Sequence, residues 1–380
     1  MMRGSISLRR CAFAIVAVGL MMLVAACGSS NSGSGGSGGG GSGKKVYMLL
    51  PNTTTVRFVS QDGPKFKAAL EKALPGTSVI VQNAEGDPSK QVQQVETAIS
   101  GGADAIVLVA ADPFIAGGAL QKAKQAKVPV LLYDHDARNG DALAQVVFDS
   151  LAVGKDQGQD AAKLFGDGTT AKPKVIARIF GNQGDYGTTK YKQGQDEFLK
   201  PLIAAGKLKV ACETYTPGWD PAKAQAEVEQ CLTKTNNRLD GIVVMNDGTA
   251  GGAIAALKSQ NLLGKVPVVG GQDADLQAIQ YILLGYQYNT VYKPFKLQAE
   301  AAAKLTAEVL KNGKLASGST DGFVPNGFMK PGVPAKFLPV QVLHKDTVDT
   351  VVKDGVWTWK QICAGAAART STCVKELNQG

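Results

Sequence analysis

The stretch AIVLVA at residues 105–110, followed by Asp112-Pro113, is the clearest indication of the fold class. An uninterrupted apolar run of this length is typical of a strand in a parallel sheet, because such a strand is buried on both faces. An aspartate followed by proline predicts a helix start, since aspartate accepts free backbone amides and proline suits the first helical position. A strand that leads into a helix is the repeating unit of doubly wound α/β proteins.

The same alternation of apolar runs and amphipathic stretches extends along most of the chain and restarts after a break near residues 149–172. Strands are predicted at residues 46–50, 78–81, 105–110, 128–133, 175–180, 207–211, 241–245 and 266–270, with an extended segment at 288–292. Helices are predicted between them, two of them starting at Asp87-Pro88 and Asp220-Pro221. We therefore predict an α/β fold of two doubly wound parallel-sheet lobes joined by a hinge.

The amino terminus is predicted to be a lipoprotein signal peptide. Arg3, Arg9 and Arg10 precede an uncharged apolar run at residues 12–26, which is too short for a comfortable membrane span and suits a signal-peptide core. The run ends in Val-Ala-Ala-Cys, which resembles the bacterial lipobox and marks Cys27 as the lipidation site; ordinary secretory cleavage near Ala26 is the alternative. Residues 28–43 are almost all glycine and serine, as in a flexible linker. This predicts an extracytoplasmic protein anchored to the outer face of the cell membrane.

The domain organisation follows from this pattern. We expect a signal peptide at 1–26, the lipidated Cys27 and linker at 27–43, an N-terminal lobe from 44–150 plus 293–330, and a C-terminal lobe with a tail from 151–292 plus 331–380.

Composition excludes several classes of protein. With 380 residues, 44% hydrophobic and 19% charged, the chain can bury a sizeable core and is not a disordered protein. The net charge of +9 is diffuse, which argues against nucleic-acid binding. Only 2 histidines are present, His135 and His344, so we expect no metal site and no cofactor. Four cysteines remain beyond Cys27, and export favours the pairs Cys212–Cys231 and Cys363–Cys373, with buried free thiols as the alternative.

Polar residues follow several predicted strands, where ligands bind in open parallel sheets. Asp134 and His135 follow one strand, Asn246 and Asp247 another, and Asp273 a third. Helix capping is the alternative role for each acid or amide. We expect Asp134, Asn246 and Asp273 to contact a ligand, and Asp247 and Asp275, one or two residues further on, to cap helices.

Three blocks of sequence resemble the periplasmic xylose-binding protein family. They are NDGTAGGAI at 246–254, GQDAD at 271–275 and TVYKP at 290–294, and weaker similarity extends over most of residues 45–355. These proteins are the sugar-binding components of ABC importers and have the type 1 periplasmic-binding fold. The resemblance thus implies a monosaccharide ligand, D-xylose or a related pentose, an ABC permease as partner, and a monomer.

The resemblance also implies further ligand-binding residues. Arg57 and Phe58 match an Arg-aromatic pair that bonds and stacks on the sugar, and Trp219 matches the tryptophan on the other sugar face. Asp185 and Lys293 match hydrogen-bonding positions. Two positions differ from the family pattern: His135 stands where arginine is usual, and Gly187 where asparagine is usual.

The function expected is therefore sugar binding for ABC import, not catalysis. A sugar-acting enzyme is the less favoured alternative, because the two histidines are scattered and match no nucleophile–His–acid set. A sensor subunit that presents the bound sugar to a signalling receptor is the other alternative.

Overall fold

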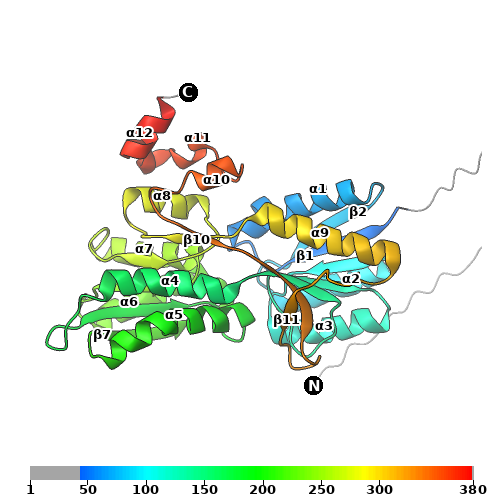
Figure 1. Cartoon of the computed structure of the whole chain (residues 1–380), viewed down its shortest axis with the longest axis horizontal. Coiled ribbons are helices and arrows are strands. Elements are labelled where there is room, and N and C mark those ends of the chain that lie inside the picture. Colours follow the sequence, from blue (N-terminus) through cyan, green and yellow to red (C-terminus); the bar gives the residue numbers. More distant parts are fainter. Residues whose placement is uncertain (1–42, 379–380) are drawn as a thin grey trace, which may run out of the picture. The chain divides into compact units, whose positions relative to one another are not determined.

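The computed structural model describes residues 43–378 (Figure 1). The predicted signal peptide, Cys27 and nearly all of the linker lie outside the described residues. Within the described part of the chain, no helix combines the length and the apolar character needed to cross a membrane.

The N-terminal lobe is built on a seven-stranded sheet of order β11-β12-β5-β4-β3-β1-β2, parallel except for β11. The strands are β1 Lys45–Leu50, β2 Ser78–Asn83, β3 Ala105–Leu108, β4 Val130–Tyr133, β5 Ala144–Phe148, β11 Gly322–Val324 and β12 Val333–Leu338. Helices cover both faces: α1 Gly63–Ala73 and α9 Phe295–Asn312 on one, α2 Pro88–Ser100 and α3 Pro113–Gln125 on the other. Alternate residues of β1 therefore enter two different cores, Met48 under α1 and α9, and Leu49 under α2 and α3.

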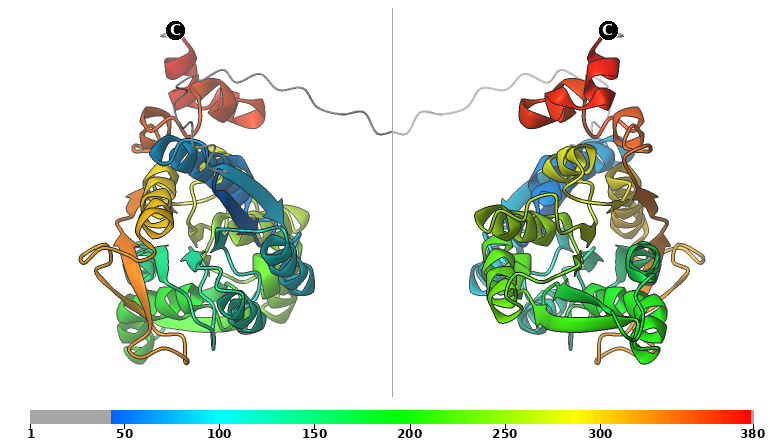
Figure 2. Two further views of the ribbon diagram at one scale, coloured as in Figure 1. Left: turned by 90° about the vertical axis from the view of Figure 1, so that its right-hand side faces the viewer. Right: turned by 90° about the vertical axis from the view of Figure 1, so that its left-hand side faces the viewer.

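The C-terminal lobe repeats this plan around a four-stranded parallel sheet of order β7-β6-β8-β9. Its strands are β6 Lys174–Phe180, β7 Leu208–Tyr215, β8 Gly241–Val244 and β9 Val268–Gly270. Its helices are α4 Ser150–Phe165, α5 Tyr186–Ala204, α6 Pro221–Lys234, α7 Asp247–Ser259 and α8 Leu276–Leu284. One face of the sheet packs on α4 and α5, the other on α6 and α7. The prediction of two doubly wound lobes is confirmed (Figures 1 and 2).

The predicted helix starts are also confirmed. Asp87, Asp112 and Asp220 each accept hydrogen bonds from backbone amides of the first turn, and a proline follows each of them.

Three chain segments connect the lobes. They lie between β5 and α4, between β10 (Thr290–Tyr292) and α9, and between β12 and β13 (Gln341–Leu343), which pairs antiparallel with β10. The expected boundary at residue 331 is wrong, because β12 pairs in parallel with β5 and so belongs to the N-terminal sheet. The physical reason is that β5 is buried along its whole length and needs a second neighbour for its backbone groups.

The chain ends in a small helical tail after β13, with α10 Thr350–Lys353, α11 Trp359–Ile362 and α12 Ser371–Leu377. It packs beside α8 (Figure 1). The structure joins Cys212 to Cys231 and Cys363 to Cys373 by disulfides. The first links β7 to α6, and the second closes the tail.

Candidate functional site

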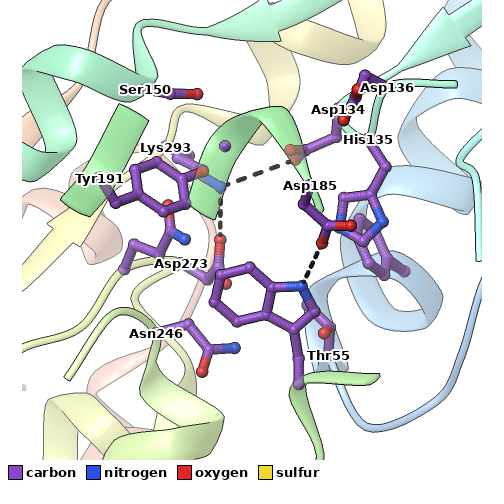
Figure 3. Close-up of a pocket in the computed structure, with 14 residues that line it drawn as sticks. Thr55, Asp134, His135, Asp136, Ser150, Asp185, Tyr191, Asn246, Asp273 and Lys293 are labelled. Atoms are coloured by element: carbon purple, nitrogen blue, oxygen red, sulfur yellow. Dashed lines mark hydrogen bonds and ion pairs between the residues drawn. The ribbon is translucent and has the colours of Figure 1, made fainter. Parts of the chain in front are cut away.

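A polar cavity lies where the carboxyl ends of the strands of both lobes meet. It has about 450 Å³ of space between its lining atoms, including its open mouth. Fourteen residues line it: Thr55, Phe58, Asp134, His135, Asp136, Ser150, Asp185, Gly187, Tyr191, Trp219, Asn246, Gln272, Asp273 and Lys293. Eight of the nine predicted ligand-binding residues are in this set, all except Arg57. Figure 3 shows ten of the lining residues labelled around the cavity.

Asp134 and Asp273 enter the cavity from different lobes, after β4 and β9 respectively. Lys293 follows β10 at a lobe crossing, and its Nζ lies 3.8 Å from a carboxylate oxygen of Asp134 and 3.2 Å from one of Asp273 (Figure 3). Burial alone would raise the pKa of Asp134, but the charges of Lys293 and Arg57 outweigh it and lower this pKa to about 2. Burial would likewise lower the pKa of Lys293, yet the two carboxylates raise it. Asp134 and Lys293 thus stay charged, and charged groups make the strongest hydrogen bonds to hydroxyls.

Arg57 lies behind the two carboxylates instead of lining the cavity. Its side chain is 1% exposed, and its guanidinium bonds Asp62 through two nitrogens at 2.6 and 2.9 Å. A third nitrogen, Nη1, contacts Asp134 at 2.7 Å and Asp273 at 3.4 Å. The guanidinium also lies over the Phe295 ring, 4.8 Å from its centroid. Arg57 therefore orients the carboxylates that face the cavity.

Two aromatic side chains line the cavity from opposite lobes. Phe58 follows β1, and its ring meets His135 edge-on with centroids 5.4 Å apart. Trp219 follows β7, and its indole Nε1 donates to Asp185 at 2.8 Å. The indole lies directly over Gly181, where a Cβ atom would come within 1.9 Å of the ring. Neighbouring protein groups therefore contact both rings and set their positions.

The carboxylate of Asp185 accepts two hydrogen bonds, one from Trp219 Nε1 and one from Asn182 Nδ2 at 3.0 Å. Burial raises the pKa of Asp185. His135 Nδ1 lies 2.8 Å from the carbonyl oxygen of Ala110. A carbonyl can only accept, so Nδ1 carries the proton and Nε2 is an acceptor in the neutral ring.

Asn246 caps a helix and also lies at the cavity. Its Oδ1 accepts from Thr249 N at 2.8 Å and caps α7, while the residue also lines the cavity. The capping role expected for Asp247 is wrong. Its carboxylate is buried and accepts from the amide of Asp275 at 2.9 Å, from Gln287 at 2.9 Å and from the Thr290 hydroxyl at 2.8 Å. Asp275 precedes α8 without a side-chain capping bond, so that expectation is also wrong.

Backbone conformation marks the same residues. Asp134, Trp219 and Asp273 have φ of 59°, 57° and 96°, a region that residues with a side chain rarely adopt. Such strain persists where surrounding contacts fix it, and it concentrates at functional sites.

Six lining residues were not predicted: Thr55, Asp136, Ser150, Gly187, Tyr191 and Gln272. Gln272 and Asp136 neighbour predicted residues, and Gly187 was noted only as a departure from the family pattern. Tyr191 gave no signal, because an aromatic residue within α5 reads as core. Its ring lies edge-on to Trp219 and close to Gly187, where a Cβ atom would be 3.0 Å from the Tyr191 hydroxyl. Gly187 thus makes room for Tyr191. Among the described residues, no group of three or more His, Cys, Asp or Glu could hold a metal ion.

Two lobes of this topology with an aromatic and charged cavity at their facing strand ends define a solute-binding protein of the type 1 periplasmic-binding fold. The model of the periplasmic binding protein domain matches residues 46–315. The chain belongs to this family, in the sugar-binding group that includes the D-xylose-binding periplasmic proteins.

Two such relatives are similar to most of the chain. The D-xylose-binding periplasmic protein of Haemophilus influenzae is 36% identical over 288 residues, covering 76% of this chain and 83% of that protein. Its namesake from Escherichia coli is 36% identical over 281 residues, covering 74% and 82%. Among solved structures, an ABC transporter solute-binding protein from Clostridium phytofermentans with bound β-D-glucose superposes with a TM-score of 0.75 at 24% identity, over 84% of this chain and 100% of that one. These relatives are binding proteins and not enzymes, and the family acts outside the cytoplasm.

Proposed function

We propose that this chain is a lipid-anchored extracytoplasmic protein that binds one monosaccharide, D-xylose or a related pentose, and delivers it to an ABC permease. The observation that carries the proposal is the cavity itself, in which two rings from opposite lobes, Phe58 and Trp219, line a space that also holds Asp134, Asp273 and Lys293. A pyranose has apolar C–H faces and a rim of hydroxyls. Aromatic rings cover such faces, and charged groups bond the hydroxyls.

Contacts between the lobes across the cavity support a closing motion on the ligand. Asp136 of the N-terminal lobe accepts from the amide of Tyr186 in the C-terminal lobe at 2.8 Å. Arg138 Nη2 donates across the same gap to the carbonyl of Gly184 at 3.1 Å. A ligand that bridges both lobes stabilises this closed form, which is how hinged binding proteins work.

The two relatives at 36% identity support a pentose as the ligand. Both bacterial relatives at 36% identity are described as D-xylose-binding. Except for Arg57, the side chains that match the family pattern line one cavity, among them Asp134, Trp219, Asn246, Asp273 and Lys293. His135 and Gly187 change the donors around it, so the preferred sugar is to be determined against a panel and not with xylose alone.

A thermal-shift screen of pentoses, hexoses and polyols tests the binding proposal. A sugar at 100 times its Kd adds about 2.7 kcal/mol to the folded state, which raises the melting temperature by several degrees. We expect a pentose to give the largest shift. A flat response to the whole panel would contradict the proposal.

A further inference from the structure

The tail lies beyond residues 46–315, the range matched by the family model, yet it shares a hydrophobic cluster with the sugar site's surroundings. Tail residues Val351, Val356 and Ile362 pack with Ala274 and Tyr292 in this cluster. Ala274 directly follows Asp273, and Tyr292 directly precedes Lys293. The tail therefore contacts the chain neighbours of two charged groups in the cavity.

Residues 354–357 of the tail, which we call the tail clamp, make three hydrogen bonds to the site's surroundings. The indole Nε1 of Trp357 donates to the carbonyl of Ala274 at 2.9 Å. The hydroxyl of Tyr292 donates to Asp354 Oδ2 at 3.0 Å. Gln61 Nε2 donates to the carbonyl of Val356 at 3.5 Å, a long contact from the N-terminal lobe.

Each contacted residue stands next to a member of the charged cluster. Gln61 precedes Asp62, which holds Arg57 through two hydrogen bonds. Ala274 and Tyr292 flank Asp273 and Lys293, whose charged groups are 3.2 Å apart. One short segment of the tail thus reaches three of the four chain segments that carry the charged groups, all except the segment with Asp134.

The backbone at Asp273 and Ala274 needs such support. Two consecutive residues with side chains have φ of 96° and 52°, which is strained for both. Two hydrogen bonds hold one side of the loop at residues 273–275. The Asp273 amide donates to the carbonyl of Val291 at 2.9 Å, and the Asp275 amide donates to the carboxylate of Asp247. The bond from Trp357 holds the Ala274 carbonyl, and the Ala274 side chain is fully buried in the tail cluster.

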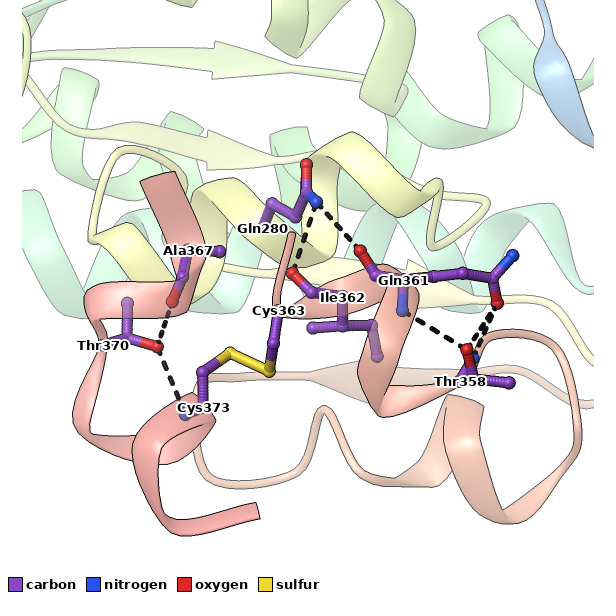
Figure 4. Close-up of a disulfide and its surroundings, with 8 residues drawn as sticks. All are labelled: Gln280, Thr358, Gln361, Ile362, Cys363, Ala367, Thr370 and Cys373. Atoms are coloured by element: carbon purple, nitrogen blue, oxygen red, sulfur yellow. Dashed lines mark hydrogen bonds between the residues drawn. A yellow bond between two sulfur atoms is a disulfide. The ribbon is translucent and has the colours of Figure 1, made fainter. Parts of the chain in front are cut away.

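The residues that directly follow the tail clamp are bonded to α8 and to one another (Figure 4). Gln280 of α8 donates to the carbonyls of Gln361 and Ile362, both at 3.2 Å. Thr358 and Gln361 cap the start of α11 reciprocally, and the Cys363–Cys373 disulfide closes the remaining tail. The clamp therefore has a rigid base on the C-terminal lobe.

We propose that the tail clamp sets the position of the sugar-binding carboxylate Asp273, with Trp357 as its positioning residue. This inference rests on the proposed function, since it concerns the affinity of the same cavity. Trp357 does not line the cavity and acts through the backbone of Ala274.

The test compares Trp357→Phe with Trp359→Phe. The first keeps an aromatic ring but removes the N–H donor. Trp359 packs on the same cluster, and no hydrogen bond of its indole occurs among the described residues, so its replacement controls for general loosening of the tail. Amide hydrogen exchange of the sugar-free proteins is measured for the peptide over residues 271–276, and Kd is measured for the sugar that the parent binds best.

We expect Trp357→Phe to speed exchange in this peptide and to raise Kd about 5- to 10-fold, as for loss of one hydrogen bond. Trp359→Phe should do neither. In an Asp273→Asn background, Trp357→Phe should change Kd less than twofold, because its effect passes through that carboxylate.

The inference would be overturned if Trp357→Phe had the same exchange rate and the same Kd as the parent. It would also be overturned if Trp357→Phe and Trp359→Phe had equal effects. Additive effects with Asp273→Asn would overturn the route through Asp273. The exchange measurement needs no sugar. If the parent bound no sugar while Trp357→Phe alone loosened residues 271–276, the proposed function would fail and the positioning of the loop would stand.

Discussion

Asp134 and Asp273 belong to opposite lobes, yet both carboxylates contact the same nitrogen of Arg57, at 2.7 and 3.4 Å. Lys293 bridges the same two carboxylates from the hinge. Arg57, Lys293 and the two carboxylates thus form one charged cluster that is shared by both lobes.

Gly181→Ala should weaken sugar binding although it replaces none of the lining side chains. The added Cβ would lie 1.9 Å from the indole of Trp219, so the ring must move off its position over the cavity. We expect the binding free energy of the sugar to weaken by about 1–3 kcal/mol, which calorimetry measures as a rise in Kd. Gly118→Ala in α3 is the matched control, since a Cβ there meets nothing within 4 Å, and it should bind like the parent. Equal Kd values for all three proteins would show that the indole position does not matter.

Asp275→Asn should change how stability depends on pH. Burial and the negative charge of Asp273 raise the pKa of Asp275 from 3.8 to about 7. Between these values the folded protein holds a proton that the unfolded chain releases, so the free energy of unfolding falls as pH rises through this window. Asparagine cannot ionise, so the variant lacks the part of this decrease in the free energy of unfolding that comes from Asp275.

Urea unfolding at about pH 5 and about pH 8 measures this effect. The parent should lose more stability between the two pH values than Asp275→Asn does. Parallel losses would mean that Asp275 is ionised throughout this range.

The disulfides provide a separate stability prediction. After export, the denatured protein should show no free thiol at Cys212, Cys231, Cys363 or Cys373. Replacing Cys212 and Cys231 together by alanine should lower the free energy of unfolding by about 3 kcal/mol, because the bond closes a loop of 19 residues in the unfolded chain. Alkylation of any of the four without prior reduction, detected by peptide mapping, would argue against the pairing.

Much of the fold was predictable, because strand burial and helix capping are local. Residues 105–110 and the Asp-Pro helix starts needed no tertiary information. The strand β12 was misplaced because its residues alternate less clearly, and only the open edge of β5 in three dimensions explains where it pairs.

The site residues likewise fall into those that the sequence predicts and those that depend on tertiary contacts. Residues directly after a strand, such as Asp134 and Asp273, were predicted because strand direction fixes where they lie. Arg57 was expected to line the cavity, but its position depends on Asp62 and the surrounding rings. Asp247 was taken for a helix cap because its partners, Gln287 and Thr290, are about 40 residues away and nothing local distinguishes a cap from a buried acceptor.

The anchor is tested by Cys27→Ser. Without the thiol no lipid can be attached, so the protein should move from the membrane fraction to the soluble or secreted one. A lipidated parent should stay with the membrane, since two or more acyl chains give stable anchoring. Retention of Cys27→Ser in the membrane fraction would rule out this cysteine as the anchor.

The central claim is that Asp273 and its partners bind a monosaccharide between the lobes, and calorimetric titration of the parent and Asp273→Ala with D-xylose and related pentoses tests it most directly. We predict one saturable site in the parent and a loss of about 2–4 kcal/mol, roughly 30- to 1,000-fold in Kd, in the variant, because the sugar hydroxyls lose a buried charged acceptor. Equal affinity of both proteins would contradict the placement of the site, and the absence of binding of any sugar to the parent would contradict the function.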